Sequence, residues 1–559
     1  MKNKILPLLF IILIAFIGCD LEREVVTGLQ EQQIIENYEY AQRRATSTYE
    51  GLPSGFTRVG NAMLASAADD AEFTHESSSI QRFNTGNWNA INNPDDQWSS
   101  NYRAIFIVNR FLETVDGVNL DVWKLDPSPS AQESYQIRLK EIEDWKNEAR
   151  FLRAFYYFEL VKRYGGVPLI TISIETTDDY SDVKRATLDE CIKFIIDECD
   201  YAAGVLPELH TSGELGRATK GSALALKSRV LLYAASDLFN DASWAGDAAN
   251  SGYIVSSNTD RIAKWKDAAD AAKAVIDLNE YSLHSNYGAL FQTFNSPEII
   301  LARRAGASNH FERINYPIGF DRGESGNTPS QNLVDSYEMN DGSKFDWNNP
   351  AHAMAPYENR DPRLAQTILA NNTTFKGRPL EIWAGGRDGK GVPRAARTGY
   401  YLRKYVNPNL NLLQNQTSVH TWILIRLAEI YLNYAEALNE SDPGNPDIKH
   451  YVDLVRARVN MPPLPDGLSQ AEMRDRIRNE RRVELAFEEH RFWDVRRWMK
   501  GAEYFGAPLR GVDITRVDED VFDYQPVNVE NRAWSDRMYL YPIPQSEILQ
   551  MGWQQNPGW

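Results

Sequence analysis

The stretch from Met473 to Trp498, MRDRIRNERRVELAFEEHRFWDVRRW, places the strictest limits on how this chain folds. Ile477, Val483 and Phe487 fall close to the three-and-four spacing that gives a helix one apolar stripe. Arginine and glutamate residues fill the other faces. The pattern predicts a helix that is half buried in the protein.

Three large aromatic residues, Phe492, Trp493 and Trp498, follow these charges closely. Planar guanidinium groups pair with carboxylates and also stack on rings, so the combination predicts a buried charge network. At three- or four-residue spacing, local pairs such as Arg481 with Glu484, and Arg491 with Glu488 or Asp494, would add only about a few tenths of a kcal/mol each if exposed.

Two chemical interpretations of the same helix compete with this structural one. Glu480, Glu484 and Glu488 stack along one helix face, as an acid/base set would, but each has an arginine within a turn. An arginine-rich helix also suits phosphate, yet the chain has a formal net charge of -17, and nucleic-acid binding needs a basic surface. We therefore expect neither catalysis nor nucleic-acid binding here.

Four segments of the chain together resemble the SusD/RagB family of surface lipoproteins. They are NEARFLRAFYYFELVKRYGGVPL, IRLAEIYLNYAEALN, RNERRVELAFEEHRFWDVRRW and the closing YLYPIPQSEILQ with QNPGW. The resemblance implies a nutrient-binding protein, most often for glycans. One departure is visible, because the family reads Glu-Gly-His where this chain has Glu488-Glu489-His490. Glu489 then either occupies a strained left-handed turn, at a cost of about 1 kcal/mol, or the helix continues through it.

The first residues have the pattern of an export signal. Lys2 and Lys4 precede an apolar run, Ile5–Ile17, that is too short for a membrane-spanning helix of roughly 20 residues. Gly18-Cys19 then resembles a lipobox, so residues 1–18 are expected to be a signal peptide and Cys19 to carry lipid. The alternative is an ordinary secretory signal with a chance cysteine.

The polar residues 19–30 are expected to form a tether with an acidic start. That start resembles the surface-export signals of lipoproteins in bacteria that carry this family. We therefore expect a protein anchored in the outer membrane through Cys19 and facing the cell exterior. Without Lys2 and Lys4 the formal charge falls to -19, an acidic surface that repels anionic polymers.

The remaining cysteines, Cys191 and Cys199, lie eight residues apart on a predicted helix. That spacing is about 12 Å of rise, beyond the ~7 Å reach of a disulfide, so both are expected to be buried free thiols. No Cys/His cluster has zinc spacing, and we expect neither a metal nor a cofactor.

Helical periodicity recurs in pairs that resemble degenerate tetratricopeptide (TPR) units. Predicted helices cover about 31–50, 95–113, 144–164, 187–206, 220–238, 264–278, 426–439 and 447–459. The fold class is therefore mostly α, a SusD-like helical scaffold with an irregular region and a few short strands. We divide it into an N-terminal region 31–280, with a loop insertion 51–94, and a C-terminal region 281–559. The latter is loop-rich over 281–420, helical over 421–500, and ends in a closing segment 501–559.

Two loop stretches have the composition of a sugar site, with aromatic rings beside amide and charged groups. The candidate ligand-binding residues are Phe83, Asn87, Trp88 and Asn89 in the first, and Asn309, His310, Phe311 and Tyr316 in the second. Trp88 has an equally good alternative role as a core anchor for its loop.

The resemblance implies that the protein captures an oligosaccharide or other nutrient without cleaving it. Its implied partner is a SusC-like TonB-dependent transporter in the outer membrane. Two other functions stay open from the sequence: a surface-displayed glycoside hydrolase, whose paired carboxylates no motif reveals, and a scaffold that binds only the transporter.

Overall fold

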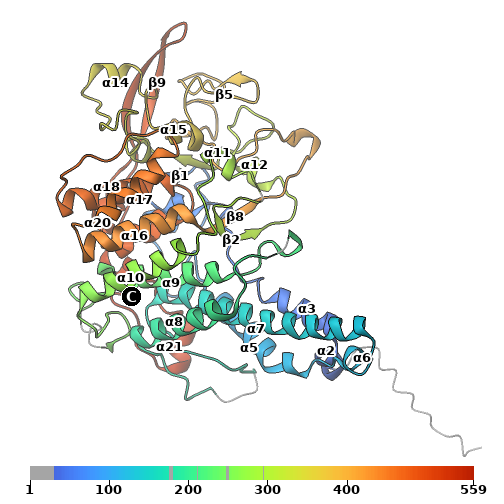
Figure 1. The fold of residues 1–559 in the computed structure, drawn as a ribbon. Coiled ribbons are helices and arrows are strands. Elements are labelled where there is room, and N and C mark those ends of the chain that lie inside the picture. The colour runs from blue at the N-terminus through green and yellow to red at the C-terminus, as the bar shows by residue number, and fades with distance from the viewer. Residues whose placement is uncertain (1–30, 176–179, 211, 247–250, 294) are drawn as a thin grey trace, which may run out of the picture.

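The computed structural model describes residues 31–559 except 176–179, 211, 247–250 and 294, and within this part helices predominate (Figure 1). The predicted mostly α fold class is confirmed. The signal peptide, Cys19 and the tether lie outside the described residues. The longer helices are α3 (Tyr38–Ser47), α5 (Trp98–Thr114), α7 (Pro129–Tyr164), α8 (Leu188–Val205), α9 (Lys220–Ala235), α10 (Arg261–Ile276), α16 (Leu427–Ser441), α17 (Pro446–Ala457), α18 (Gln470–Glu484) and α19 (His490–Arg497).

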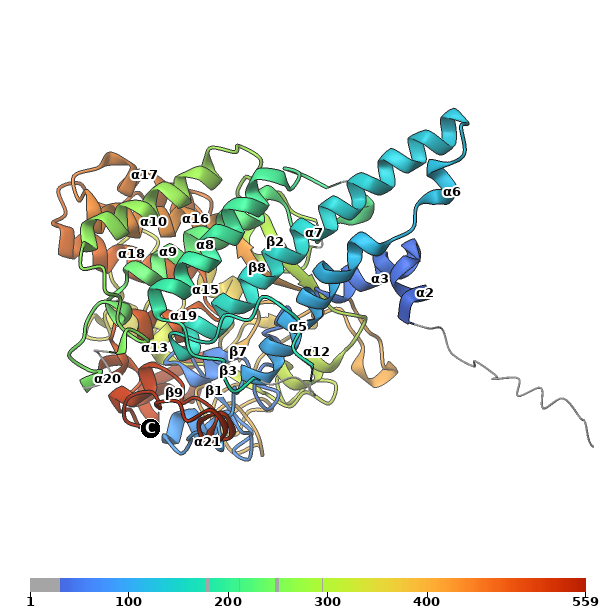
Figure 2. The same cartoon turned by 90° about the horizontal axis from the view of Figure 1, so that it is seen from below.

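Most of these helices stack side by side in one array, which Figure 2 shows from below, while α19 lies outside it. Helix α7 packs against α5 and α8, and the contacts continue from α8 to α9, from α9 to α10 and from α10 to α16. Helix α16 then packs against α17 and α18. Because α10 lies against α16, the predicted N-terminal and C-terminal helical regions share one continuous stack.

Local sequence signals explain where several helices begin. Thr187 and Glu190 form a capping box at the start of α8, in which each side chain bonds the backbone N–H of the other. Helix α7 begins well before the predicted residue 144, because Ser128 caps its first turn and Pro129 suits the first helical position. Its N-terminal half extends beyond the array with α6 (Asp121–Lys124) beside it (Figure 2).

The region 281–420 has little regular structure, as predicted, and holds short elements. Its helices are α11 (Tyr287–Leu290), α12 (His310–Asn315), α13 (Gln331–Val334), α14 (Pro350–Met354) and α15 (Pro362–Thr367). Its strands are β2 (Ile299–Arg304), β3 (Asn327–Pro329), β4 (Ile368–Leu369), β5 (Thr374–Phe375), β6 (Arg378–Pro379) and β7 (Tyr401–Leu402). Strand β2 pairs with β8 (Thr421–Arg426), which leads directly into α16.

The closing segment contains a hairpin that the sequence pattern did not predict. Strands β9 (Leu509–Asp518) and β10 (Val521–Glu530) pair antiparallel and project from the top of the molecule in Figure 1. Around the hairpin, the segment adds the short helices α20 (Gly501–Tyr504) and α21 (Gln545–Met551). The sheets of the described residues are all two-stranded and antiparallel.

The insertion 51–94 passes through the core for much of its length. It forms the 3-10 helix η1 (Leu64–Ala67), strand β1 (Ala71–Phe73) and helix α4 (Gln81–Thr85), and residues 62–73 are all buried. Buried carbonyl groups need donors, and Arg532 supplies them by donating to Ala68 and Ala71. Only parts of this insertion are therefore available to a ligand.

The charged stretch 473–498 is not the single helix that its periodicity predicts. Helix α18 ends at Glu484 and α19 begins at His490, and between them Phe487 and Glu489 adopt positive φ angles of 61° and 68°. Of the two conformations expected for Glu489, the structure shows the strained left-handed one. The break turns Glu484 and Glu488 toward the protein interior.

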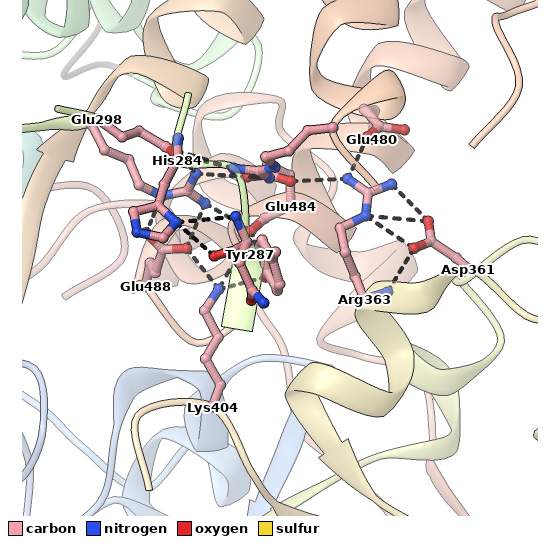
Figure 3. Close-up of polar contacts among 12 residues, drawn as sticks. His284, Tyr287, Glu298, Asp361, Arg363, Lys404, Glu480, Glu484 and Glu488 are labelled. Carbon is pink, nitrogen blue, oxygen red and sulfur yellow. Dashed lines mark hydrogen bonds and ion pairs between the residues drawn. The ribbon is translucent and has the colours of Figure 1, made fainter. Parts of the chain in front are cut away.

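Those two carboxylates are central to a buried charge network, drawn in Figure 3. Arg426 at the end of β8 donates to Glu488 at 2.7 Å and to Glu484 at 2.6 Å. Arg363 reaches Glu484 at 3.0 Å, and Lys404 reaches Glu488 at 2.7 Å. The predicted network is confirmed, and it joins the loop-rich region to α18.

None of the local ion pairs considered from the spacing forms among the described residues, because both arginines pair with other carboxylates. Arg481 pairs with Asp494 at 2.7 Å, and Arg491 pairs with Asp69 at 2.8 Å. Carboxylates in the interior form more complete hydrogen bonds with a guanidinium group, shielded from water, than a neighbour on the same helix does.

Candidate ligand-binding site

A groove of about 790 Å³ opens near the base of the β9–β10 hairpin. Three segments that are far apart in the sequence line it. They are residues 74–77, which follow β1, residues 390–397, and a hairpin wall formed by Asp513 and residues 527–529. We call this the polar groove. Its volume lies within the range of small-molecule sites, ~300–1,000 Å³.

Strand pairing positions the first wall of the polar groove. Strand β1 pairs antiparallel with β3, and the Thr74 N–H still donates to Gly326 at 3.0 Å. The chain then leaves the core, so that His75 reaches the surface. The His75 ring lies 4.9 Å from that of Phe73, and its Nε2 lies 3.3 Å from the Glu324 carbonyl.

Ion pairs fix the second wall. Arg397 pairs with the buried Glu72 and, at 3.1 Å, with Glu76, whose side chain is 79% exposed. Burial raises the pKa of the Glu72 carboxyl, and the Arg397 guanidinium opposes this shift. Lys390 bridges to Asp513 on the hairpin at 2.8 Å. The groove therefore has both charge signs on its walls, with most of the charges already paired.

Arg394 differs from these residues. Its side chain is exposed and contacts no ion-pair or hydrogen-bond partner among the described residues, and its backbone has φ of 66°. A left-handed conformation in a residue other than glycine costs about 1 kcal/mol or more, and such strain occurs often at binding sites. Arg394 thus presents a free guanidinium to the groove.

A second polar patch surrounds His310. His310 Nε2 lies 3.2 Å from Asn61 Oδ1, and Arg313 donates to His310 Nδ1 at 3.1 Å. Asn309 donates to the Gln416 carbonyl at 3.0 Å. The Glu324 N–H donates to the Arg313 carbonyl, which connects this patch to the groove through Glu324.

Four of the predicted ligand contacts are core residues, and this burial corrects the prediction that their rings stack on a sugar. The exposed fractions are 2% for Trp88, 6% for Phe83, 3% for Phe311 and 0% for Tyr316. Trp88 packs against Phe83, Tyr541 and Trp559 with ring centroids 4.5–5.3 Å apart. Its alternative role as a loop anchor is the one that the structure shows, because burying so large an apolar surface stabilises the core.

The polar residues among the predicted contacts divide into two groups. Asn309 and His310 lie on the patch around His310, and neither of them lines the polar groove. Asn87 and Asn89 are exposed on the loop around Trp88, where Asn89 Oδ1 accepts from the Ile91 N–H in a local turn. That loop contacts the C-terminal segment through Ala90 and Gln545, and no residue of it lines the polar groove.

Sequence reasoning missed Glu76, Arg394 and Arg397. For Arg394 and Arg397, the sequence signal was the run GGRDGKGVPRAARTG, residues 385–399, in which arginine and lysine alternate with glycine. Glycine-rich loops that carry several cations are typical of exposed binding segments. An emphasis on aromatic residues directed the prediction toward rings that belong to the core.

Comparison with known proteins agrees with this architecture. A model described as "SusD family" matches residues 297–559, and one described as "Starch-binding associating with outer membrane" matches residues 24–232. The chain belongs to the SusD/RagB family. It is 23% identical to SusD-like protein P2 of Formosa agariphila, with 98% of each chain covered.

Solved SusD-like structures share the fold over almost the whole chain. A SusD-like protein of Bacteroides fragilis has a TM-score of 0.77 at 27% identity, covering 95% of this chain and 99% of its own. A SusD-like carbohydrate-binding protein from the same species has a TM-score of 0.75 at 26% identity, with 92% and 99% covered. Among the helices of the described residues, none combines the length and apolar character needed to cross a membrane.

Proposed function

We propose that this SusD-family protein binds an oligosaccharide in the polar groove at the outside of the cell. The observation that supports the proposal most directly is the free Arg394 guanidinium on a strained loop, inside a groove of ligand size. Sugar hydroxyls accept from guanidinium and amide groups and donate to carboxylates, and the groove supplies all three kinds of partner in Arg394, Glu76 and Asn528. The carbohydrate-binding relative and the starch-binding family description agree with this ligand class.

The proposal extends to the location and partner of the protein. Lipid on Cys19 would hold it in the outer leaflet of the outer membrane, and bound glycan would pass to a SusC-like TonB-dependent transporter. The family description, which includes association with the outer membrane, supports this location. A Cys19→Ala variant is expected to leave the membrane fraction, and mass spectrometry of the mature N-terminus is expected to find acyl chains. Co-purification with a co-expressed SusC-like protein tests the partner.

Calorimetric titration tests ligand binding. Maltoheptaose is one probe because the matching family model is described as starch-binding, and laminarihexaose is another because one solved fold neighbour is a laminarin-binding SusD-like protein. For the glycan that binds, Arg394→Ala is expected to weaken affinity about 10-fold, the value of one charged hydrogen bond. Arg103→Ala is the matched control, because Arg103 is an exposed arginine on α5, away from the groove.

Two results would contradict the proposal. Equal affinities for the Arg394→Ala and Arg103→Ala variants would place the glycan elsewhere. Release of reducing ends from the bound glycan would instead indicate a hydrolase, since capture without cleavage leaves the chain length unchanged.

A further inference from the structure

A second groove, of about 920 Å³, lies on the other side of α18 from the buried network. We call it the α18 groove. Helices α10, α18 and α20 contribute to its walls and lie on the left of the molecule in Figure 1. The 3-10 helix η4 (Asp237–Phe239) also contributes, through Asp237. None of its lining residues belongs to the polar groove.

Three arginines follow one another at four-residue spacing along the wall formed by α18. Arg474 pairs with Glu440 at 2.5 and 2.7 Å, and Arg482 pairs with Asp69 and Asp70 at 2.8 Å. Arg478, between them, contacts no ion-pair or hydrogen-bond partner among the described residues, and its Nε is buried without one. The structure therefore leaves the middle cation of the row uncompensated.

Packing holds Arg478 in place. Its guanidinium lies 4.7 Å from the centre of the Trp498 ring, and that ring is fixed because its Nε1 donates to Glu436 at 2.8 Å. The carboxylate of Glu436 acts on Arg478 electrostatically, but both of its oxygens bind Arg497, at 2.6 and 2.7 Å. A guanidinium that is stacked and partly desolvated without an anion is poised to bind one.

The charges around Arg478 select the kind of anion. Besides Glu436, the carboxylate of Asp237 acts on Arg478 electrostatically, and both line the groove. Arg474 and Arg497 also act on Arg478, and each of these four neighbouring charges has a partner of its own: Glu436 with Arg497, Asp237 with Arg261, and Arg474 with Glu440. One unpaired guanidinium among paired charges suits a ligand with a single negative charge. We propose that the α18 groove binds a sugar-sized ligand through a monoanionic group, a carboxylate or a sulfate ester, held by Arg478. This site is separate from the proposed polar-groove site and does not depend on it.

Three monosaccharides of similar size test the proposal on the full chain: glucuronate, glucose 6-sulfate and glucose. Binding of glucuronate or glucose 6-sulfate, but not of glucose, is expected in calorimetric or NMR titration. The comparison of the two acids shows which anionic group the site prefers. Arg478→Gln is expected to weaken that binding about 10- to 100-fold, the value of a charged, two-pronged hydrogen bond.

Two controls separate this site from the polar groove. Arg103→Gln removes an exposed arginine that lies outside the α18 groove, and is expected to leave the affinity for the acid unchanged. Arg478→Gln is expected to leave oligosaccharide binding in the polar groove unchanged, so the two proposals can fail independently. Where Arg478→Gln lowers the thermal stability, Ala471→Trp gives a second measurement, because Ala471 is exposed in the groove wall and a tryptophan there fills ligand space.

The proposal is overturned if neither acid binds the wild-type protein. It is also overturned if the acid binds with the same affinity after both Arg478→Gln and Ala471→Trp.

Discussion

Replacing Glu489 with glycine is expected to stabilise the protein. Glu489 has φ of 68°, and glycine adopts this conformation without the roughly 1–2 kcal/mol penalty of an L side chain. Its Oε1 is also buried without a hydrogen-bond partner among the described residues, which costs about 1–3 kcal/mol. Glycine loses more chain entropy on folding, about 0.4–1 kcal/mol. The electrostatic attraction of Arg58 and Lys162 to the carboxylate, which opposes the effect of burial, is lost too.

The net gain expected for Glu489→Gly is therefore about 1–2 kcal/mol. Urea denaturation measures it, and an unfolding entropy of ~2.1 cal/mol/K per residue makes it a rise in Tm of about 1–2 °C for a chain of this size. Glu489→Ala separates the two contributions, because alanine removes the carboxylate but keeps the strain. The alanine variant is expected to be about 1 kcal/mol less stable than the glycine variant.

The gain also depends on pH. Burial raises the pKa of the Glu489 carboxyl above its ordinary value of 4.5. A raised pKa means that the folded state binds this proton more tightly than the unfolded state does. Protonation of Glu489 therefore stabilises the wild-type fold fully below pH 4.5, and this stabilisation is lost as the pH rises through the folded pKa. The advantage of Glu489→Gly over wild type should be larger at pH 7 than at pH 4. A glycine variant less stable than wild type at pH 7 would refute this reasoning.

Three further perturbations follow from the buried charges and thiols. Arg426→Ala leaves Glu484 and Glu488 partly unpaired in the interior and is expected to cost about 3–5 kcal/mol by denaturation, whereas Lys140→Ala, at an exposed ion pair, should cost under about 1 kcal/mol. The Arg497 guanidinium lowers the pKa of the Glu436 carboxyl from 4.5 to about 2 despite burial. The contribution of this carboxylate to stability is therefore present above pH 4.5 and is lost as the pH falls toward 2. Glu436→Gln should reduce this loss of stability in acid. Burial raises the pKa of the Cys191 thiol to about 12 and that of Cys199 further, so both should resist iodoacetamide at pH 8 until the protein is unfolded, and rapid labelling of the native chain would contradict their burial.

Local chemistry explains which features the sequence could predict. The buried thiols on α8 were predicted from residues within a few turns of one another, and they are confirmed. The capping box of Thr187 and Glu190 is an equally local signal. The β9–β10 hairpin was missed because the alternation in β9 is short: Val512 and Ile514 are buried, but Arg516, the next residue on the same face, is charged and exposed. In β10 five of the ten residues are exposed and none is buried, so no buried face marks the strand.

The candidate site depended much more on the tertiary structure. Sequence composition favoured Trp88 as a ligand contact, but the structure buries its side chain. A tryptophan between two asparagines occurs both in cores and on surfaces, so the local sequence does not distinguish the two. The walls of the polar groove come from residues 74–77, 390–397 and 527–529, whose approach is set by strand pairing and by Arg397 with Glu72. No local pattern encodes such distances.

The sequence alone therefore determined the helical scaffold, the family and the presence of a buried arginine–carboxylate network, because amphipathic spacing, caps and residue types act over a few turns. Only the tertiary structure decided which carboxylate each arginine binds, that Glu489 breaks the helix, and which cations remain unpaired. The physical reason is that desolvation and ion pairing depend on what surrounds a side chain in space. Arg474, Arg478 and Arg482 have the same sequence spacing, yet only Arg478 of the three lacks a partner among the described residues.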